Sequence, residues 1–131
     1  MTPEERRAIE WDITQLIVRY ANLNDLGRWK DVAALYTENG QMARPTAPDT
    51  PVVGRDAILA SLLARPPRVT QHVISNIVVD VEGATAASAW SGITLYTGKD
   101  TPPLLGWFKD KLVLTADGWR FTERRGGLTF A

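Results

Sequence analysis

The sequence lacks cysteine altogether and contains a single histidine among its 131 residues. Without cysteine there can be no disulfide bond, no thiolate nucleophile and no zinc site built on thiolates. One histidine cannot form a histidine-rich metal site, and the carboxylates do not cluster as a hard-cation site would require. The glycine-rich motifs of dinucleotide and P-loop binding are also missing. We therefore expect no metal and no other cofactor.

An excess of charge of one sign is missing as well, because 15 Lys and Arg balance 15 Asp and Glu. No global positive field attracts nucleic acid or an anionic membrane surface. The longest nearly apolar run, residues 57–64, is much shorter than the roughly 18 residues of a membrane span, and the N-terminus has no apolar leader segment. We expect a cytoplasmic protein that binds a small molecule rather than nucleic acid or membrane.

The first half of the chain shows helical patterns. Thr2, followed by Pro3 and by Glu5 three residues later, is typical of a helix start. Apolar side chains then recur at helical spacing in one stripe that Tyr20 closes: Ile9, Ile13, Leu16, Ile17 and Tyr20. This spacing predicts a long amphipathic helix ending near Asn24.

Two shorter helices are expected next. After the break at residues 25–27, apolar positions from Trp29 to Tyr36 predict a helix that residues 37–40 terminate, so that Asp25 lies in the elbow of a helical hairpin. Residues 44–53 contain three prolines and predict a loop, either a lid or a connector. A third helix follows Gly54 and stops at Pro66.

From Val69 onward the apolar period changes to two. Strands are predicted at residues 69–81, 85–97, 104–115 and 118–129, joined by turns as an antiparallel meander. Helices followed by strands indicate one α+β domain over residues 1–131, with the helices packed on one face of a curved sheet. A sheet covered in this way can enclose a pocket.

His72 is the candidate for chemistry, because histidine is the side chain that changes charge near neutral pH. It is either a base facing the pocket, a core histidine with satisfied hydrogen bonds, or a solvated one at a strand edge. Asp25 either caps the second helix or orients His72 and stabilises its imidazolium. Tyr20 is either a proton donor or a core aromatic with a bonded hydroxyl.

Other candidates lie on the predicted strands. Trp90, Trp107 and Phe108 either line an apolar pocket or belong to the ordinary core. Strand alternation places Asn76 on the same face as His72, where it could bind a substrate oxygen or satisfy a strand irregularity.

Two charged segments on the same strands have a simpler interpretation. Residues 109–111 alternate in sign along a strand, and residues 123–125 form a short charged run. Alternating charges of this kind are typical of a solvated or subunit-facing surface. Short charged runs are typical of the solvated end of a strand. We therefore expect both segments on the outside of the molecule.

Four segments together resemble the SnoaL-like family of the nuclear-transport-factor-2-like (NTF2-like) superfamily. They are Tyr20-x4-Asp25-x3-Trp29, residues 53–58, residues 71–76 and residues 117–121. The resemblance covers nearly the whole chain. It implies an α+β cone in which three helices wrap a curved mixed sheet around a deep pocket. Members such as scytalone dehydratase and bile-acid 7α-dehydratase use a histidine–aspartate pair, without cofactor, to remove a proton during elimination.

The resemblance assigns catalytic roles to His72 as base, Asp25 as its partner and Tyr20 as acid or oxyanion donor. Scytalone dehydratase has a second histidine on the following strand, where this chain has Tyr96 and Thr97. The acid role then falls to Tyr20, Tyr96 or a water molecule, and Tyr96 joins Asn76, Trp90, Trp107 and Phe108 as a predicted substrate-binding residue.

The resulting hypothesis is a cofactor-independent lyase or isomerase, most concretely a dehydratase for a small hydrophobic cyclic or polyketide-like molecule. The alternative is a non-catalytic binding or dimerisation module of the same fold, because fold alone does not fix a reaction. Trp, Val and Leu side chains on the outer sheet face predict a homodimer.

Overall fold

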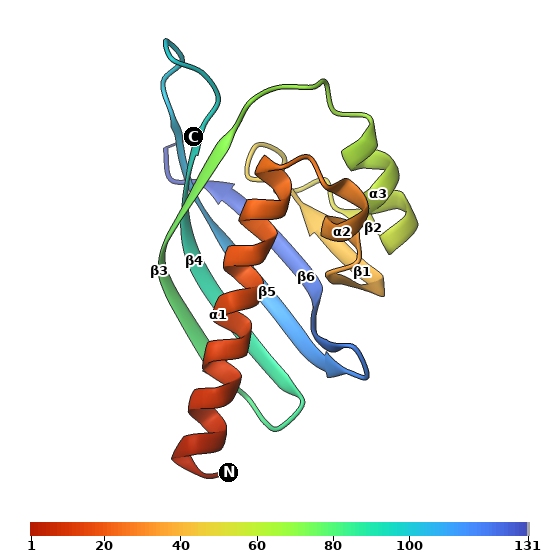
Figure 1. Ribbon diagram of the computed structural model, residues 1–131, viewed down its shortest axis with the longest axis vertical. Coiled ribbons are helices and arrows are strands. Elements are labelled where there is room, and N and C mark those ends of the chain that lie inside the picture. The colour runs from red at the N-terminus through yellow and green to blue at the C-terminus, as the bar shows by residue number, and fades with distance from the viewer. Residues whose placement is uncertain (131) are drawn as a thin grey trace.

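The computed structural model describes residues 1–130, and its order of elements confirms the α+β class. In chain order the elements are α1 (Pro3–Asp25), α2 (Trp29–Ala33), β1 (Tyr36–Ala43), β2 (Val52–Val53), α3 (Arg55–Leu63), β3 (Gln71–Val81), β4 (Ala86–Tyr96), β5 (Leu104–Thr115) and β6 (Gly118–Leu128). Figure 1 shows the long α1 lying along a curved sheet, with α2 and α3 at one end.

Helix α1 begins where the capping pattern predicts. The Thr2 hydroxyl accepts a hydrogen bond from the Glu5 backbone, and the Glu5 carboxylate accepts one from the Thr2 backbone. The reciprocal pair satisfies two amide donors that a helix start leaves free. The buried residues of the helix include the predicted stripe from Ile13 to Tyr20, so the helix packs its apolar face against the sheet. None of the helices within residues 1–130 has the length and apolar character of a membrane span.

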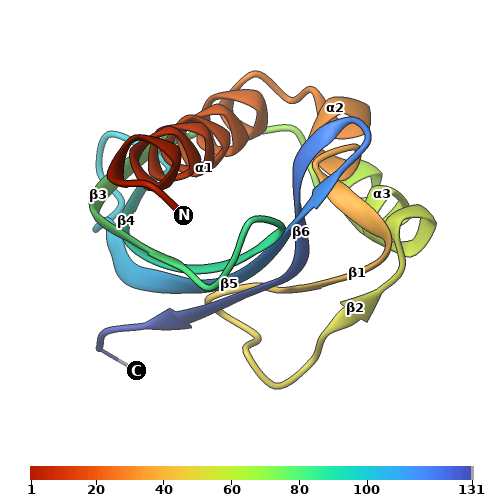
Figure 2. The same cartoon turned by 90° about the horizontal axis from the view of Figure 1, so that it is seen from below.

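The sheet has six strands in the order β2-β1-β6-β5-β4-β3. Strands β3 to β6 form the predicted antiparallel meander, while β1 lies parallel to β6 and makes the sheet mixed. Seen end-on in Figure 2, the sheet curls around α1, which lies on its concave side. No helix lies against the convex side of β3, β4 and β5 in this view.

The second predicted helix is too long, and β1 was not predicted. Helix α2 ends at Ala33, and Tyr36 already belongs to a strand. The reason is tertiary: the Phe121 N–H bonds the carbonyl oxygen of Leu35, and Tyr36 pairs with Phe121 in the parallel β1–β6 ladder. A register shift between Tyr36 and Gln41 breaks the alternation that would identify this strand from sequence. The predicted 44–53 loop gives its last two residues to β2.

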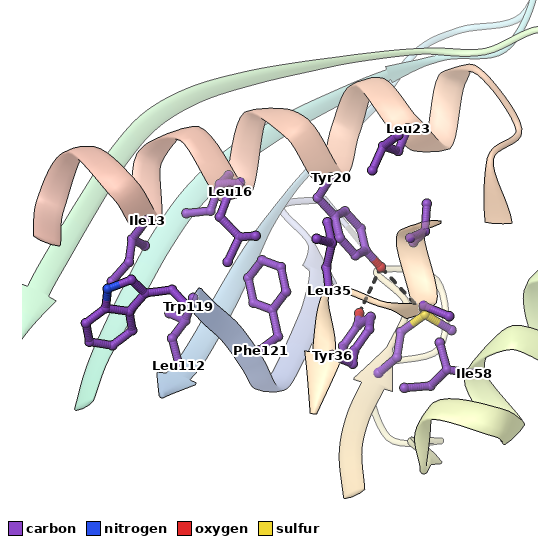
Figure 3. Packing of buried hydrophobic residues seen from close by; sticks show 14 of the residues in the cluster. Ile13, Leu16, Tyr20, Leu23, Leu35, Tyr36, Ile58, Leu112, Trp119 and Phe121 are labelled. Atoms are coloured by element: carbon purple, nitrogen blue, oxygen red, sulfur yellow. Dashed lines mark hydrogen bonds between the residues drawn. The ribbon is translucent and has the colours of Figure 1, made fainter. Parts of the chain in front are cut away.

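The core lies between α1, α2, α3 and the concave side of the sheet. Figure 3 shows its centre, where Tyr20 from α1 meets Tyr36 from β1 and Phe121 from β6. The Tyr20 ring stands edge-on to the other two, with centroids 5.9 Å and 5.5 Å away. Edge-to-face packing of this kind adds roughly 0.5–1.5 kcal/mol per pair beyond burial.

A buried ion pair lies beside this aromatic cluster. Asp110 on β5 and Arg124 on β6 are paired across the two strands, with Arg124 Nε 3.1 Å from Asp110 Oδ1. Both side chains are almost completely inaccessible, which corrects the prediction that the segments containing them are solvated. Strict alternation from Phe121 would turn Arg124 outward, but the register shift between Lys111 and Leu112 makes Thr122 an extra residue and turns Arg124 inward.

We predict that the burial of Asp110 makes the protein less stable as the pH rises. Burial raises the pKa of its carboxyl from 3.8 to about 6, even though Arg124 acts in the opposite direction. The folded state therefore holds this proton more tightly than the unfolded state, and the stability contributed by the neutral acid is lost as the pH rises from about 4 through 6. In Asp110→Asn the side chain stays neutral and this loss does not occur.

Urea unfolding of both proteins at pH 4.5 and 7.5 measures the effect. The free energy of unfolding of Asp110→Asn, relative to the original protein, should improve by on the order of 1–3 kcal/mol between the two pH values. A relative stability that is flat, or that worsens with pH, would contradict the assignment.

Candidate active site

One cavity of about 710 Å³ opens on the concave side of the sheet, between the end of α1, the segment after α3 and the inner faces of β3 to β6. Its size suits a small organic ligand. Much of its wall is apolar, and the large aliphatic and aromatic side chains that line it include Leu26, Trp29, Met42, Leu63, Ile74, Ile93, Leu95, Leu104, Phe108 and Leu128. Asp25, Thr70 and His72 supply polar groups to the same wall.

Asp25 and His72 meet in this cavity. Nδ1 of His72 lies 2.5 Å from Asp25 Oδ1, and the backbone N–H of His72 donates to Oδ2 at 2.8 Å. The Thr70 hydroxyl donates to Oδ1 at 2.9 Å. Three groups at the start of β3 therefore converge on one carboxylate at the end of α1.

The local sequence explains this convergence. Asp25 is the last residue of α1, and β3 is an edge strand, so its outward-facing N–H at His72 has no neighbouring strand to bond. The Asp25 carboxylate takes the place of that strand. Helix α2 begins after Arg28 and has no side-chain cap, so Asp25 does not have the capping role that was the alternative.

The carboxylate also determines the tautomer of His72. An ionised carboxylate only accepts hydrogen bonds, so the neutral imidazole places its proton on Nδ1. Nε2 then carries a lone pair, and it has no hydrogen-bond partner among residues 1–130. A base with an orienting carboxylate and a free lone pair, in a cavity of ligand size, is equipped to remove a proton from a ligand.

Tyr20 lines the cavity, and its hydroxyl is hydrogen-bonded within the core. The hydroxyl lies 2.8 Å from the Tyr36 hydroxyl and 3.7 Å from Met42 Sδ, deep in the core (Figure 3). Burial raises the pKa of Tyr36 well above its usual value, and Tyr20 raises it further, so Tyr36 stays a neutral partner. Tyr20 therefore has the bonded, buried hydroxyl of a core aromatic and also lines the cavity that contains His72.

Of the residues predicted to bind substrate, Phe108 lines the cavity and the other aromatics do not. Trp107 is its neighbour on β5 and therefore faces the convex side, where its ring covers Gly127 and Lys109 lies 5.2 Å from its centroid. Trp90 and Tyr96 on β4 are outside the cavity lining and substantially exposed. Adjacent strand residues point to opposite faces, which rules out a shared pocket role for Trp107 and Phe108.

Asn76 is also outside the cavity lining. It adopts a positive φ of 53° in β3, where the register against β4 shifts between Ser75 and Val78. The bulge changes which alternate residues face inward. His72 and Ile74 face inward before it, and Ile77 and Val79 face inward after it. Asn76 tolerates the left-handed conformation better than most residues, which is the strand-irregularity role weighed for it.

Four arginines in the cavity wall were not predicted. Arg44, Arg65, Arg68 and Arg124 contribute to the lining, together with Trp29 at the start of α2. Trp29 belonged to the resemblance motif, and that could have drawn attention to it. Arg124 had no usable signal, because its inward orientation depends on the β6 bulge.

No three His, Asp or Glu side chains gather as a metal site in the described part of the chain, and the sequence contains no cysteine. Asp25 and His72 are a hydrogen-bonded pair of titratable side chains in this cavity.

The sequence and the fold of this chain are both similar to those of known proteins. The model of the SnoaL-like domain family matches residues 5–125. No curated protein matches the sequence. A protein of Novosphingobium aromaticivorans, provisionally assigned as a scytalone dehydratase, has a TM-score of 0.86 at 24% identity, covering 98% of this chain and 89% of the other.

Two further solved structures share the fold. A provisionally assigned dehydratase of the NTF2-like family from Streptomyces avermitilis has a TM-score of 0.83 at 15% identity, over 99% of this chain and 100% of that one. A protein of Catenulispora acidiphila in complex with S-DNPA has a TM-score of 0.71 at 23% identity, over 93% and 94%. The family match over nearly the whole sequence, on an NTF2-like fold, shows that this chain belongs to the SnoaL-like domain family.

Proposed function

We propose that this protein is a cofactor-independent lyase or isomerase, most concretely a dehydratase of a small hydrophobic cyclic or polyketide-like molecule. The observation that carries the proposal is the bonding of His72: Nδ1 is held by Asp25 and Nε2 has no partner within residues 1–130 in a ligand-sized cavity. The family relationship and the provisionally assigned dehydratases with the same fold support it.

The proposed reaction begins with proton removal from carbon. In a β-hydroxy carbonyl compound, Nε2 of His72 takes the proton next to the carbonyl group, and the electron pair of the C–H bond becomes an enolate. Asp25 stabilises the imidazolium through Nδ1. General base catalysis of this kind typically contributes about 10²–10⁴-fold.

The same histidine can complete the elimination. The C–O bond to the β-hydroxyl group breaks, the enolate electrons form the C=C bond, and the imidazolium returns its proton to the leaving oxygen to give water. This assignment replaces Tyr20 and Tyr96 as acids, since the Tyr20 hydroxyl is bonded to Tyr36 and Tyr96 is 47% exposed outside the cavity lining. Return of the proton to a different carbon would make the protein an isomerase.

A neutral probe that needs only a base tests this proposal without knowledge of the substrate. 5-Nitrobenzisoxazole opens to a coloured phenolate when a base removes its ring C–H proton. The original protein should accelerate the opening above free imidazole at equal concentration. The rate should fall about 10²-fold in His72→Gln and substantially in Asp25→Asn, because the base or its orientation is lost.

The matched control is Asp12→Asn, on the exposed face of α1, which should keep the full rate. Circular dichroism checks that each variant is folded. If the original protein is no faster than free imidazole, or if folded His72→Gln retains the rate, the catalytic proposal is wrong and the binding module becomes the better account.

We also propose that the protein forms a homodimer through the convex sheet face. The exposed apolar side chains on this side of the meander are Val73, Val78, Trp90, Tyr96 and Leu105. Val78 on β3 pairs with Trp90 on β4. Thr94 on β4 lies between Val73 on β3 and Leu105 on β5, so these side chains are on adjacent strands. Exposed apolar side chains on a sheet face without a covering helix favour isologous pairing.

Light scattering after size-exclusion chromatography measures the assembly. At micromolar concentration the original protein should have about twice the chain mass of 14.5 kDa. Trp90→Lys should shift it towards the monomer, because a charge would be buried without a partner. Trp11→Lys replaces an exposed tryptophan on α1 and should leave the mass unchanged. A monomeric mass for the original protein would refute the dimer.

A further inference from the structure

Three arginines in the cavity wall have no carboxylate partner within residues 1–130. Arg44 directly follows β1, and Arg65 and Arg68 lie in the segment between α3 and β3, which passes the C-terminal end of α1 (Figure 1). None of the three forms a salt bridge with a described carboxylate. Asp25 is the one carboxylate in the described lining, and it is already bonded to the start of β3. The wall therefore has an excess of positive charge, in a chain of zero net charge.

Two of these arginines are held in place by neutral groups. Arg65 donates from Nη1 to Asn24 Oδ1 at 3.2 Å, and its guanidinium carbon lies 5.4 Å from the centroid of the Trp29 ring. Arg44 donates from Nη2 to the Ser61 hydroxyl at 2.6 Å. These contacts fix the positions of both guanidinium groups without neutralising their charge.

Both guanidinium groups also keep donors that a ligand can reach. Nε and Nη2 of Arg65, and Nε and Nη1 of Arg44, have no hydrogen-bond partner within residues 1–130, and each of the four nitrogens retains accessible surface. They differ in this from the nitrogens of Arg124, which are fully enclosed. Burial lowers the pKa of Arg65, and the positive charge of Arg44 lowers it further. A bound anion would stabilise both charges.

We infer that the cavity takes a carboxylic acid with an apolar body, whose carboxylate accepts hydrogen bonds from the accessible donors of Arg65 and lies in the field of Arg44 and Arg68. A planar guanidinium matches the geometry of a carboxylate, and a charge-assisted bond is stronger than one to a neutral acceptor. This inference deepens the proposed function, on which it rests for treating the cavity as the substrate site. It makes the substrate an organic acid rather than a neutral compound.

The groups that hold the arginine and the imidazole are neighbours in sequence. Arg65 bonds the side chain of Asn24, and His72 bonds that of Asp25. Cα atoms of consecutive residues are about 3.8 Å apart, so the end of α1 holds both groups at the same end of the cavity. The carboxylate of the ligand and the carbon that loses its proton would lie at this end, with the apolar body against the strands.

Binding of 1-naphthoate and of its neutral analogue 1-naphthamide tests the inference by calorimetry, with no turnover required. The original protein should bind naphthoate about tenfold more tightly than naphthamide, because only the carboxylate pairs with a guanidinium. Arg65→Met removes the donors, keeps an apolar stem against Trp29 and should abolish this preference. The control Arg28→Met removes the charge of an exposed arginine outside the cavity lining and should retain it.

His72→Gln separates the arginine from the imidazole as the group that binds the anion. The preference for naphthoate should persist in this variant, because Arg65 rather than a protonated imidazole holds the carboxylate. A preference that is lost in folded His72→Gln and kept in folded Arg65→Met would assign the anion to the imidazole and overturn the inference.

A measurement on the original protein keeps the test valid should Arg65→Met fail to fold. The nitrogen-15 resonance of Arg65 Nε should shift on addition of naphthoate and not of naphthamide. Equal affinities, no binding of either compound at millimolar concentration, an unshifted resonance, or a preference that survives in folded Arg65→Met would each overturn the inference. These outcomes leave the proton-removal test with 5-nitrobenzisoxazole untouched, because that probe is neutral and depends on His72.

Discussion

The contact between the end of α1 and the start of β3 determines how this molecule is organised around its cavity. The Asp25 carboxylate accepts from the Thr70 hydroxyl, from the His72 backbone and from His72 Nδ1. It thereby bonds the free edge of the sheet to the helix that lies across its concave side. The same three bonds orient the imidazole towards the cavity, so one carboxylate serves both the fold and the chemistry. A substitution at Asp25 consequently acts on both, and activity must always be read beside a measure of folding.

The opposite wall of the cavity obeys a different constraint, the cost of burying charge. Asp110 and Arg124 form a pair on neighbouring strands, and removal of either partner leaves the other uncompensated. The rings of Tyr20, Phe108 and Phe121 enclose the guanidinium, and both members of the pair are buried. The cost of burying these two charges is therefore offset by their contact with each other and with the rings.

Long periodic patterns made most of the fold predictable. Helix α1 and the meander from β3 to β6 follow from local periodicity, and the dyad of Asp25 and His72 followed from the family resemblance. Strand β1 was missed because its pairing with β6 joins distant parts of the chain and its own alternation is broken. Bulges explain two further errors, since they turn Asn76 out of the cavity lining and Arg124 into it. The assignment of both Trp107 and Phe108 to one pocket was avoidable, because neighbours on a strand face opposite sides.

Nitrogen-15 NMR of the imidazole reports directly on whether the base is oriented, because His72 is the sole histidine and its signals need no assignment. Neutral His72 should carry its proton on Nδ1, with Nε2 unprotonated, and Asp25→Asn should lose this preference. A proton on Nε2 in the original protein, or a tautomer mixture that Asp25→Asn leaves unchanged, would contradict the existence of an oriented base in this cavity.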